Sequence, residues 1–273
     1  MFNLPRFDLP TPFAISGRAI STALIAAALL STVSSANAAL FKNIPTNTEA
    51  RLSVGINALY ANSAYDTDAD TVRVLPGAFY DNNRIYARGP SVGAYIINDG
   101  VNQLSASVQL AGNSFDPDDG NGALAGLDER KISASAGLNY QRRTPIGAFR
   151  LQAATDILDN SGGNTARLSY LSRIQKDKLT IIPSVGFEYY DADYNEYYYG
   201  VGSEESARTG VSTYTANSSL NPYVNVSANY EFNDKWSGFA NQSVSYLPNE
   251  QYDSPMVDSR VEAATTLGLL YKF

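Results

Sequence analysis

Residues 132–141 read ISASAGLNYQ, in which apolar residues alternate with small polar residues or glycine at every step. A period of two sends successive side chains to opposite faces of a β-strand. The same period recurs in residues 104–110, 179–189 and 224–232. Helical spacing persists nowhere for more than about two turns. The sequence therefore predicts an all-β protein.

Turn residues such as Asn98-Asp99-Gly100 separate the predicted strands. By number, the strands are 50–61, 71–80, 84–97, 100–112, 130–143, 147–156, 164–175, 178–190, 220–232, 235–246 and 261–273. A single-chain bacterial membrane barrel needs an even number of strands, and this list has an odd one. Because proline cannot donate to a β-ladder, Gly89-Pro90 splits 84–97 and gives twelve strands. A ten-stranded barrel with an excluded N-terminal segment is the alternative.

Two kinds of closed barrel use such alternation, a soluble one with an apolar interior and a membrane one with an apolar exterior. Charged residues are 17% of the chain, below the roughly 25% of a soluble domain. Aromatic residues such as Tyr60, Tyr140 and Trp236 lie at strand ends, as the interfacial girdles of a membrane barrel require. Short turns also alternate with long acidic loops. We therefore predict a transmembrane antiparallel β-barrel in the lipid of the bacterial outer membrane.

The composition excludes several classes of function. The formal charge of −7 argues against nucleic acid as a partner. The chain contains no His and no Cys, so a Ser-His-Asp triad, a thiolate nucleophile and an ordinary zinc site cannot form. The acidic loop 116–122 lacks the ligand spacing of a calcium loop. We therefore predict a protein that is not an enzyme and has no cofactor.

The N-terminal residues have the pattern of a secretory signal peptide. Residues 19–30 read AISTALIAAALL, an apolar run too short to span a bilayer. Ala36-Asn37-Ala38 follows as a small-x-small cleavage pattern. We predict a signal peptide over 1–38, a periplasmic N-terminal segment over 39–49 and the barrel over 50–273.

The last strand has the pattern of an assembly signal. Alternate apolar residues form one face up to the terminal residue: Leu267, Leu269, Tyr271 and Phe273. This ending resembles the C-terminal sorting signal of bacterial outer-membrane proteins. The resemblance implies recognition by the barrel assembly machinery.

Three loop motifs carry a resemblance to a known family. They comprise Gly126, Leu127, Asp128, Glu129 and Arg130; Tyr198, Tyr199, Gly200 and Val201; and Asp253, Ser254 and Pro255. In this order, and with the Tyr-Lys-Phe ending, the chain resembles the MltA-interacting protein (MipA/OmpV) family. The resemblance implies an outer-membrane scaffold that holds a murein lytic transglycosylase near a penicillin-binding protein, a peptidoglycan synthase.

Two other groups of residues invite functional interpretation. Strand parity places five charges where they can project into the lumen: Arg150, Arg167, Arg173, Glu188 and Glu231. They either pair across a filled interior or line a small pore. The tyrosines of 189–199 either contact a partner or glycan, or pack among themselves in the barrel mouth. A narrow channel for small solutes is therefore the alternative to the scaffold, and acidic outer loops that bind envelope ligands or cations are a third.

Overall fold

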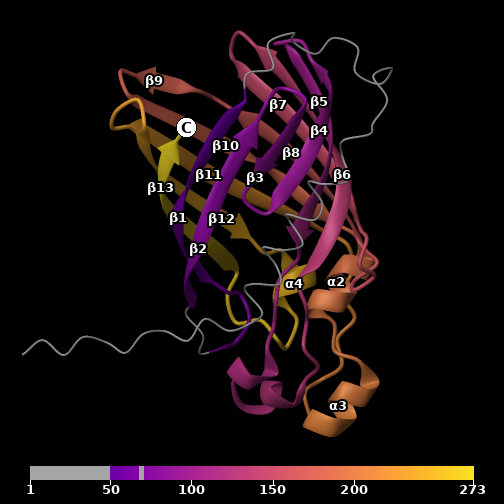
Figure 1. Ribbon diagram of the computed structural model, residues 1–273. Coiled ribbons are helices and arrows are strands. Elements are labelled where there is room, and N and C mark those ends of the chain that lie inside the picture. The colour runs from indigo at the N-terminus through magenta and orange to yellow at the C-terminus, as the bar shows by residue number, and fades with distance from the viewer. Residues whose placement is uncertain (1–49, 68–70) are drawn as a thin grey trace, which may run out of the picture. The chain divides into compact units, whose positions relative to one another are not determined.

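The computed structural model describes residues 50–67 and 71–273, and the expected signal peptide (1–38) and N-terminal segment (39–49) lie outside them. Strands dominate the described chain (Figure 1). They are β1 (Arg51–Asn62), β2 (Thr71–Asp81), β3 (Ile85–Arg88), β4 (Ser91–Asn98), β5 (Asn102–Ala111), β6 (Ser133–Thr144), β7 (Gly147–Asp156), β8 (Asn164–Leu171), β9 (Ile174–Lys176), β10 (Leu179–Tyr190), β11 (Ser219–Glu231), β12 (Trp236–Tyr246) and β13 (Val261–Lys272). These strands are the ones that the alternation predicts.

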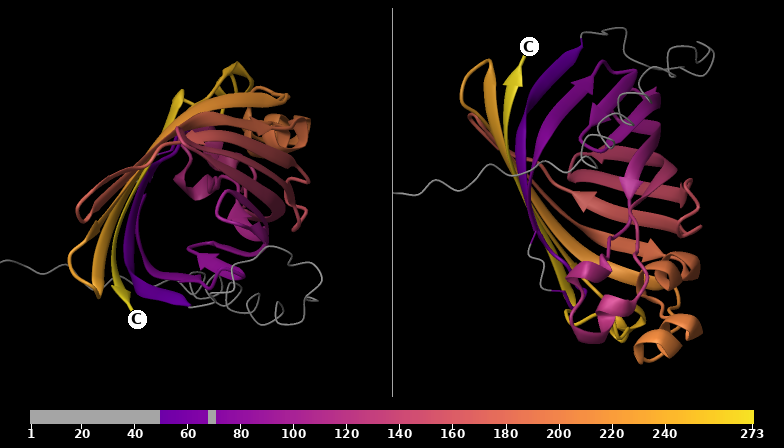
Figure 2. Two further views of the ribbon diagram at one scale, coloured as in Figure 1. Left: turned by 90° about the horizontal axis from the view of Figure 1, so that it is seen from above. Right: turned by 60° about the horizontal axis from the view of Figure 1, so that its bottom comes forward.

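The strands form one antiparallel sheet that closes on itself (Figure 2). Neighbours in the sequence pair in turn, β11 pairs with β10, and β1 pairs with β13. The short β8 and β9 pair with successive parts of β10 and together occupy one position in the wall. The barrel therefore has twelve strand positions. This confirms the predicted strand number and the split of 84–97 at Gly89-Pro90.

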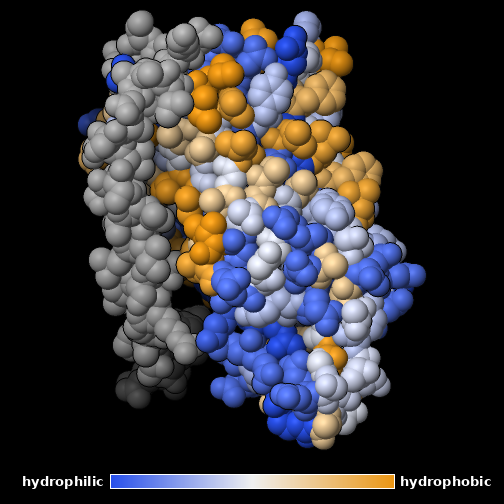
Figure 3. Space-filling model, turned by 90° about the vertical axis from the view of Figure 1, so that its right-hand side faces the viewer, coloured by the Kyte–Doolittle hydropathy of each residue, from blue (hydrophilic) through white to orange (hydrophobic). Residues whose placement is uncertain are grey.

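The two faces of the wall have opposite polarity. Side chains on the outer face are apolar and exposed, including Ile56 (61%), Val74 (69%) and Leu267 (54%). Inward positions carry small polar residues, such as the buried Ser105 and Ser169. Figure 3 shows the apolar side chains gathered in a band over the barrel wall, above a polar end. The apolar face is therefore the one that meets lipid.

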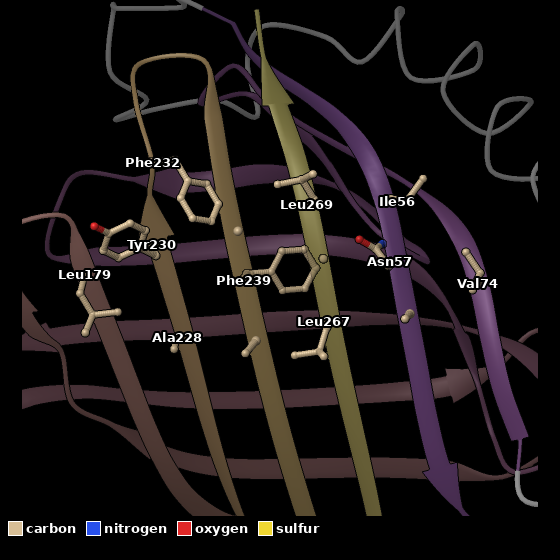
Figure 4. A pocket seen from close by; sticks show the side chains of 14 residues that line it. Ile56, Asn57, Val74, Leu179, Ala228, Tyr230, Phe232, Phe239, Leu267 and Leu269 are labelled. Carbon is tan, nitrogen blue, oxygen red and sulfur yellow. The ribbon is translucent and has the colours of Figure 1, made fainter. Parts of the chain in front are cut away.

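A shallow apolar groove of about 520 Å³ runs over this outer face, across β1, β2 and β10 to β13. Small residues such as Ala228 leave room between larger ones such as Phe232 and Leu269 (Figure 4). Gly238 and Ala240 also belong to the lining. Its lining is almost wholly apolar, which suits contact with hydrocarbon chains.

The expected assembly signal forms the closing strand. Leu267 and Leu269 point outward from β13, and the Tyr271 ring packs edge-on against Trp236 and Phe273. The N–H of Phe273 donates to the carbonyl of Leu52 on β1. These aromatic rings lie at one end of the barrel, where they form part of an interfacial girdle.

The two ends of the barrel differ in the length of the segments that join the strands. Short turns join the strands at one end, and we call this end the turn rim: turns 82–84, 99–101, 145–146, 177–178 and 232–235, with the strand residues beside them. Long loops lie at the other end, and we call them the cap: 63–67, 112–132, 157–163, 191–218 and 247–260. Membrane barrels keep short turns on the periplasmic side, so the cap faces outward.

Short helices lie within the cap: η3 (Pro117–Asp119), η4 (Gly122–Gly126), α2 (Ala192–Tyr199), α3 (Ser203–Thr209) and α4 (Asn249–Tyr252). The carboxylate of Asp191 caps α2 by accepting from the N–H of Tyr194. Gly210 ends α3 in the left-handed conformation, with φ of 79°, which glycine adopts without strain. In the described part of the chain, no helix is both long and apolar enough to cross a bilayer.

Candidate functional site: a loop cap over a polar lumen

The cap has its own hydrophobic core. Thirteen buried residues from four of its five loops pack together: Ala64, Tyr65, Phe115, Leu124, Leu127, Tyr194, Tyr198, Tyr199, Val201, Val211, Ala216, Leu247 and Met256. Tyrosine rings supply much of this core. The Tyr190 and Tyr194 rings stack with centroids 4.5 Å apart, and Tyr65 packs edge-on against Phe115 at 5.4 Å. The cap is therefore a folded layer held by long-range packing.

The tyrosine-rich segment supplies part of this core. This favours the interpretation that its rings pack among themselves in the barrel mouth. Tyr198 and Tyr199 are 0% and 2% exposed. The Tyr65 hydroxyl donates to the Tyr198 carbonyl, and the Tyr198 hydroxyl donates to the Lys131 carbonyl. Burial raises the pKa of the Tyr194 and Tyr199 hydroxyls well above the usual range, so both rings stay neutral.

The first two family motifs meet at one buried ion pair, and the third is bonded to the second. Arg130 donates through Nη2 to both carboxylate oxygens of Glu205, at 2.9 and 3.0 Å. The same Nη2 donates to the Gly200 carbonyl at 3.0 Å, in the second motif. In the third motif, the Ser254 hydroxyl donates to the Tyr199 carbonyl at 2.6 Å. Segments more than 120 residues apart in the sequence thus share one hydrogen-bonded network.

Glu205 satisfies several groups at once. It accepts from the N–H of Asp128 at 2.9 Å and from the N–H of Gly202 at 3.1 Å, which caps α3. Burial alone would raise the pKa of Glu205, but these hydrogen bonds and the Arg130 guanidinium outweigh it and hold the pKa below its usual range. The carboxylate is therefore ionised wherever the cap is folded at neutral pH.

Helix α3 holds the first motif from its other side. Arg208 donates to the Gly126 carbonyl at 3.0 Å and to the Asp128 carboxylate at 2.7 Å. A Cβ on Gly126 would lie 2.7 Å from the Thr209 methyl group, so only glycine permits this close approach. Leu127 packs into the cap core, whereas Glu129 lies 3.7 Å from Lys131 near the surface. Of the third motif, Asp253 lies 4.0 Å from Arg260 and Pro255 is exposed.

Beneath the cap, the lumen holds a polar pocket of about 340 Å³. Its lining includes Gln109 on β5, Asn113 just after it, and Gln152, Arg167 and Glu188 on β7, β8 and β10, which follow β5 and β6 around the wall. Tyr190 and Tyr194 bound it on the cap side. The cap therefore covers the outer end of this pocket.

Of the five charged residues predicted to face the lumen, three lie on the lumen wall: Arg150, Arg167 and Glu188. Arg167 forms an ion pair with Glu188 and lies over the Tyr223 ring, 5.0 Å from its centroid. Arg150 donates from Nε and Nη2 to Gln141 Oε1, at 3.0 and 2.7 Å. The other two lie at the turn rim. Glu231 pairs with Lys272 at 2.8 Å, and Arg173, between β8 and β9, is exposed and donates to Gln175.

The two ends carry opposite charge. Acidic residues predominate in the cap: Asp66, Asp116, Asp118, Asp119, Asp128, Glu129, Asp159, Asp191, Asp193, Glu196, Glu204, Glu205, Glu250, Asp253 and Asp258. Basic residues predominate at the turn rim: Arg51, Arg84, Arg142, Arg143, Arg173, Lys176, Lys178, Lys235 and Lys272. Within the described ranges, Lys272 is the one member of the basic group with an ion-pair partner.

The acidic cap does not gather its carboxylates into a metal site. Among residues 50–67 and 71–273, no group of three or more Asp and Glu could hold a metal ion. The 116–122 loop forms η3, where the Asp116 carboxylate accepts from the Asp118 N–H. That contact is an ordinary turn cap.

The sequence pattern does not predict the cap network, although the three loop motifs contain several members of that network. The Arg130–Glu205 pair joins positions 75 residues apart, and no periodic signal links two loops. The partner role of α3 was likewise missed, because seven residues give too short a helical pattern.

Comparison with known proteins gives a consistent picture. Residues 54–273 match the family model described as MltA-interacting protein MipA. The chain is 37% identical over 210 residues to the MltA-interacting protein of Escherichia coli K12, covering 77% of this chain and 84% of the relative. It is 32% identical over 227 residues to the putative outer membrane protein YiaT of the same strain, covering 83% and 92%. Outer membrane protein OmpV of Vibrio cholerae is 27% identical over 170 residues, covering 62% and 65%.

Solved structures similar to this chain include two outer-membrane channels. That of Pseudomonas putida F1 is 9% identical, with a TM-score of 0.42, over 85% of this chain and 100% of the other. The channel DcaP of Acinetobacter baumannii is 10% identical, with a TM-score of 0.35, over 82% and 96%.

Proposed function

The chain belongs to the MltA-interacting protein family of outer-membrane barrels, and from this premise we propose that it is a non-enzymatic scaffold. It holds a murein lytic transglycosylase at the inner face of the outer membrane, beside a penicillin-binding protein that synthesises peptidoglycan. The name of the relative from Escherichia coli supports the first partner. The second partner rests on the family resemblance.

One observation carries this proposal: the periplasmic end of the barrel is a ring of exposed, mostly unpaired basic side chains. Arg142, Arg143 and Lys235 are all exposed at the turn rim. Peptidoglycan enzymes work on the periplasmic side, so the turn rim is the end they reach. Each turn is short, but basic residues outnumber the acidic ones at this rim, which are Asp81, Asp99, Asp177, Glu231 and Asp234. The excess of positive charge complements an acidic partner surface.

The decisive experiment measures retention of a purified murein lytic transglycosylase on the immobilised, folded mature chain. Reversing the rim charges in the triple variant Arg142→Glu, Arg143→Glu and Lys235→Glu should abolish retention. The matched control reverses charges on the other end, with Asp118→Lys and Asp119→Lys, and should retain the enzyme fully. Equal retention by the rim variant would contradict docking at the rim. Absence of retention by the parent chain would contradict the scaffold itself.

The sequence pattern predicts that the segment 39–49 lies in the periplasm, and we propose that it adds contact area for the partner. Deleting it should weaken retention, because the turns alone present little surface. Undiminished retention would exclude the segment from the interface and leave the rim as the whole contact.

A narrow channel for small solutes is the second candidate, and the polar lumen favours it. The cap over the pocket counts against it, because Tyr190 and Tyr194 bound the pocket at its outer side. Planar-bilayer recording separates the two candidates. A channel should give discrete conductance steps that change in Arg150→Ala, whereas the scaffold needs no conductance.

A further inference from the structure

The barrel wall has one incomplete seam, between β2 and β3. β2 pairs with β1 along its whole length, from Thr71 to Asp81, but with β3 only over Phe79–Asp81. Every other seam of the wall that does not involve the short β3 and β9 joins at least seven residue pairs. In the described ranges, no strand pairs with the free edge of residues 71–77.

The free edge exposes backbone polar groups. The N–H of Gly89 donates to the Ala78 carbonyl, so even-numbered residues of β2 direct their backbone groups toward β3. By this parity, Val72, Val74 and Pro76 direct theirs into the gap. Pro76 has no N–H to leave unsatisfied there, and proline is typical of such an edge. Backbone groups at membrane depth need an internal partner or a polar cavity.

The hairpin that borders the gap lies next to residues that line the polar pocket of the lumen. The tip of the β3–β4 hairpin, Gly89-Pro90, bridges the two sides, since the Pro90 carbonyl accepts from the N–H of Leu110 on β5. Leu110 and its neighbour Ala111 line the pocket. On the cap side, the bridge between Thr67 and Gly120 closes the gap. Figure 1 shows the short hairpin beside the longer β2.

Apolar side chains form a cluster on one part of the lumen wall, beside inward polar residues such as Asn57, Arg73 and Asn241. Strand register places Leu59, Leu75, Phe79 and Phe239 on the inner face of β1, β2 and β12. The Phe79 and Phe239 rings meet edge-on with centroids 5.9 Å apart, and Leu75 is 41% exposed. The polar pocket lies on β5 to β10. Such an interior suits a molecule that has both an apolar and a polar part.

The polar part of the lumen wall contains a cation that lacks a counter-ion. Arg88 pairs with Asp81 at 2.7 Å, and Arg167 pairs with Glu188. Within the described residues, Arg150 has no carboxylate partner and bonds only to the neutral Gln141. It lies one inward position from Gln152, which lines the pocket. A cation in a low-dielectric interior favours an anion.

We propose that the lumen binds a single-chain amphiphile with an anionic head, of the class of long-chain fatty acids, which enters from the bilayer through the gap beside β2. The carboxylate lies against Arg150, and the acyl chain lies along Leu75, Phe79 and Phe239. The polar groups of Val72, Val74 and Pro76 border the entry route. This site is independent of any partner at the turn rim.

The test uses tryptophan quenching, because the chain has a single tryptophan, Trp236. In a Trp236→Phe background, Leu75→Trp places a reporter in the lumen and Val74→Trp places one in the lipid. Both variants are folded into vesicles of phosphatidylethanolamine and phosphatidylglycerol. A brominated long-chain fatty acid should quench both reporters, whereas a brominated phosphatidylcholine should quench only the reporter at position 74.

The head-group contact is tested in the same vesicles. Adding Arg150→Gln to the luminal reporter should raise the half-quenching concentration of the fatty acid about tenfold, the factor for one lost charge-assisted hydrogen bond. Arg150→Lys should recover most of the affinity. Arg142→Gln, at the turn rim, is the matched control and should change nothing. Resistance to heat in detergent gels verifies that each variant is folded.

Three outcomes would overturn the proposal. The reporter at position 75 could remain unquenched by the fatty acid, which would exclude luminal binding. It could be quenched equally by both lipids, which would mean simple bilayer exposure. A single Val74→Cys variant could form a disulfide-linked dimer in the membrane, which would assign the free edge to a second copy of this chain.

Discussion

The cap and the turn rim are made by the same strands, yet they are ordered in different ways. The cap depends on side chains that meet across long sequence separations, such as Arg130 with Glu205. The turn rim depends on local contacts, such as the Asp99 carboxylate accepting from the N–H groups of Val101 and Asn102. Substitutions in the cap should therefore change stability, and substitutions at the rim should change binding.

The largest effect should follow from Arg130→Ala. This change leaves the Glu205 carboxylate buried without its cation, which typically costs about 3–5 kcal/mol. We expect the cap loops to become sensitive to protease while the barrel keeps its mobility in detergent gels. Arg142→Ala at the turn rim is the control and should leave the cleavage pattern unchanged. A protected cap in Arg130→Ala would mean that the tyrosine core alone orders the loops.

Acid should have a smaller effect on the same network. Because the pKa of Glu205 is lower in the folded cap than in the unfolded one, its contribution to stability is complete above the ordinary value of about 4.3 and is lost as pH falls through the folded value. Arg130 keeps its bonds to the Gly200 and Asp128 carbonyls, so the loss should be smaller than in Arg130→Ala. Proteolysis by an acid protease between about pH 5 and pH 2, the range in which carboxylates titrate, measures this loss of cap stability. Glu205→Gln should lack this pH dependence.

Gly126→Ala should have the next smaller effect. The new Cβ would lie 2.7 Å from the Thr209 methyl group, and overpacking of this kind costs about 1–3 kcal/mol. Thr209→Ser removes that methyl group but keeps the hydroxyl that donates to the Glu205 carbonyl. The double variant should therefore regain most of the stability in loop proteolysis. If it is as unstable as Gly126→Ala alone, the clash is not the cause.

The smallest effect on stability should come from the turn rim. Lys235→Glu changes an exposed side chain in a turn, so the free energy of unfolding should shift by no more than about 0.5 kcal/mol. Urea titration of the folded barrel in lipid measures this shift. A large loss of stability would show that the basic ring has a structural role and would weaken the contrast between the two ends.

The sequence predicts the barrel because each wall residue meets one of two solvents. In 132–141, alternate residues face lipid and the polar lumen, which produces the alternation of apolar and polar residues. Pro90 lies at the break between β3 and β4. The alternation does not show that β3 is too short to cover β2. The reason is that strand lengths alone do not say which residues of two strands pair. Loop residues meet no periodic environment, so the contacts of Arg130 with Gly200 and of Ser254 with Tyr199 appear only in three dimensions.

The pairing of β1 with β13 has a consequence for the order of assembly. Asn62 donates to the Val261 carbonyl, 199 positions further along the chain, so the first and last strands of the barrel form a single seam. The first strand must wait, with one edge uncovered, until the last has left the ribosome and crossed the inner membrane. Contacts between residues so far apart in the sequence form slowly. A chain that lacks its final strand leaves two open edges, at β1 and at β12, and each is a template for pairing with another chain.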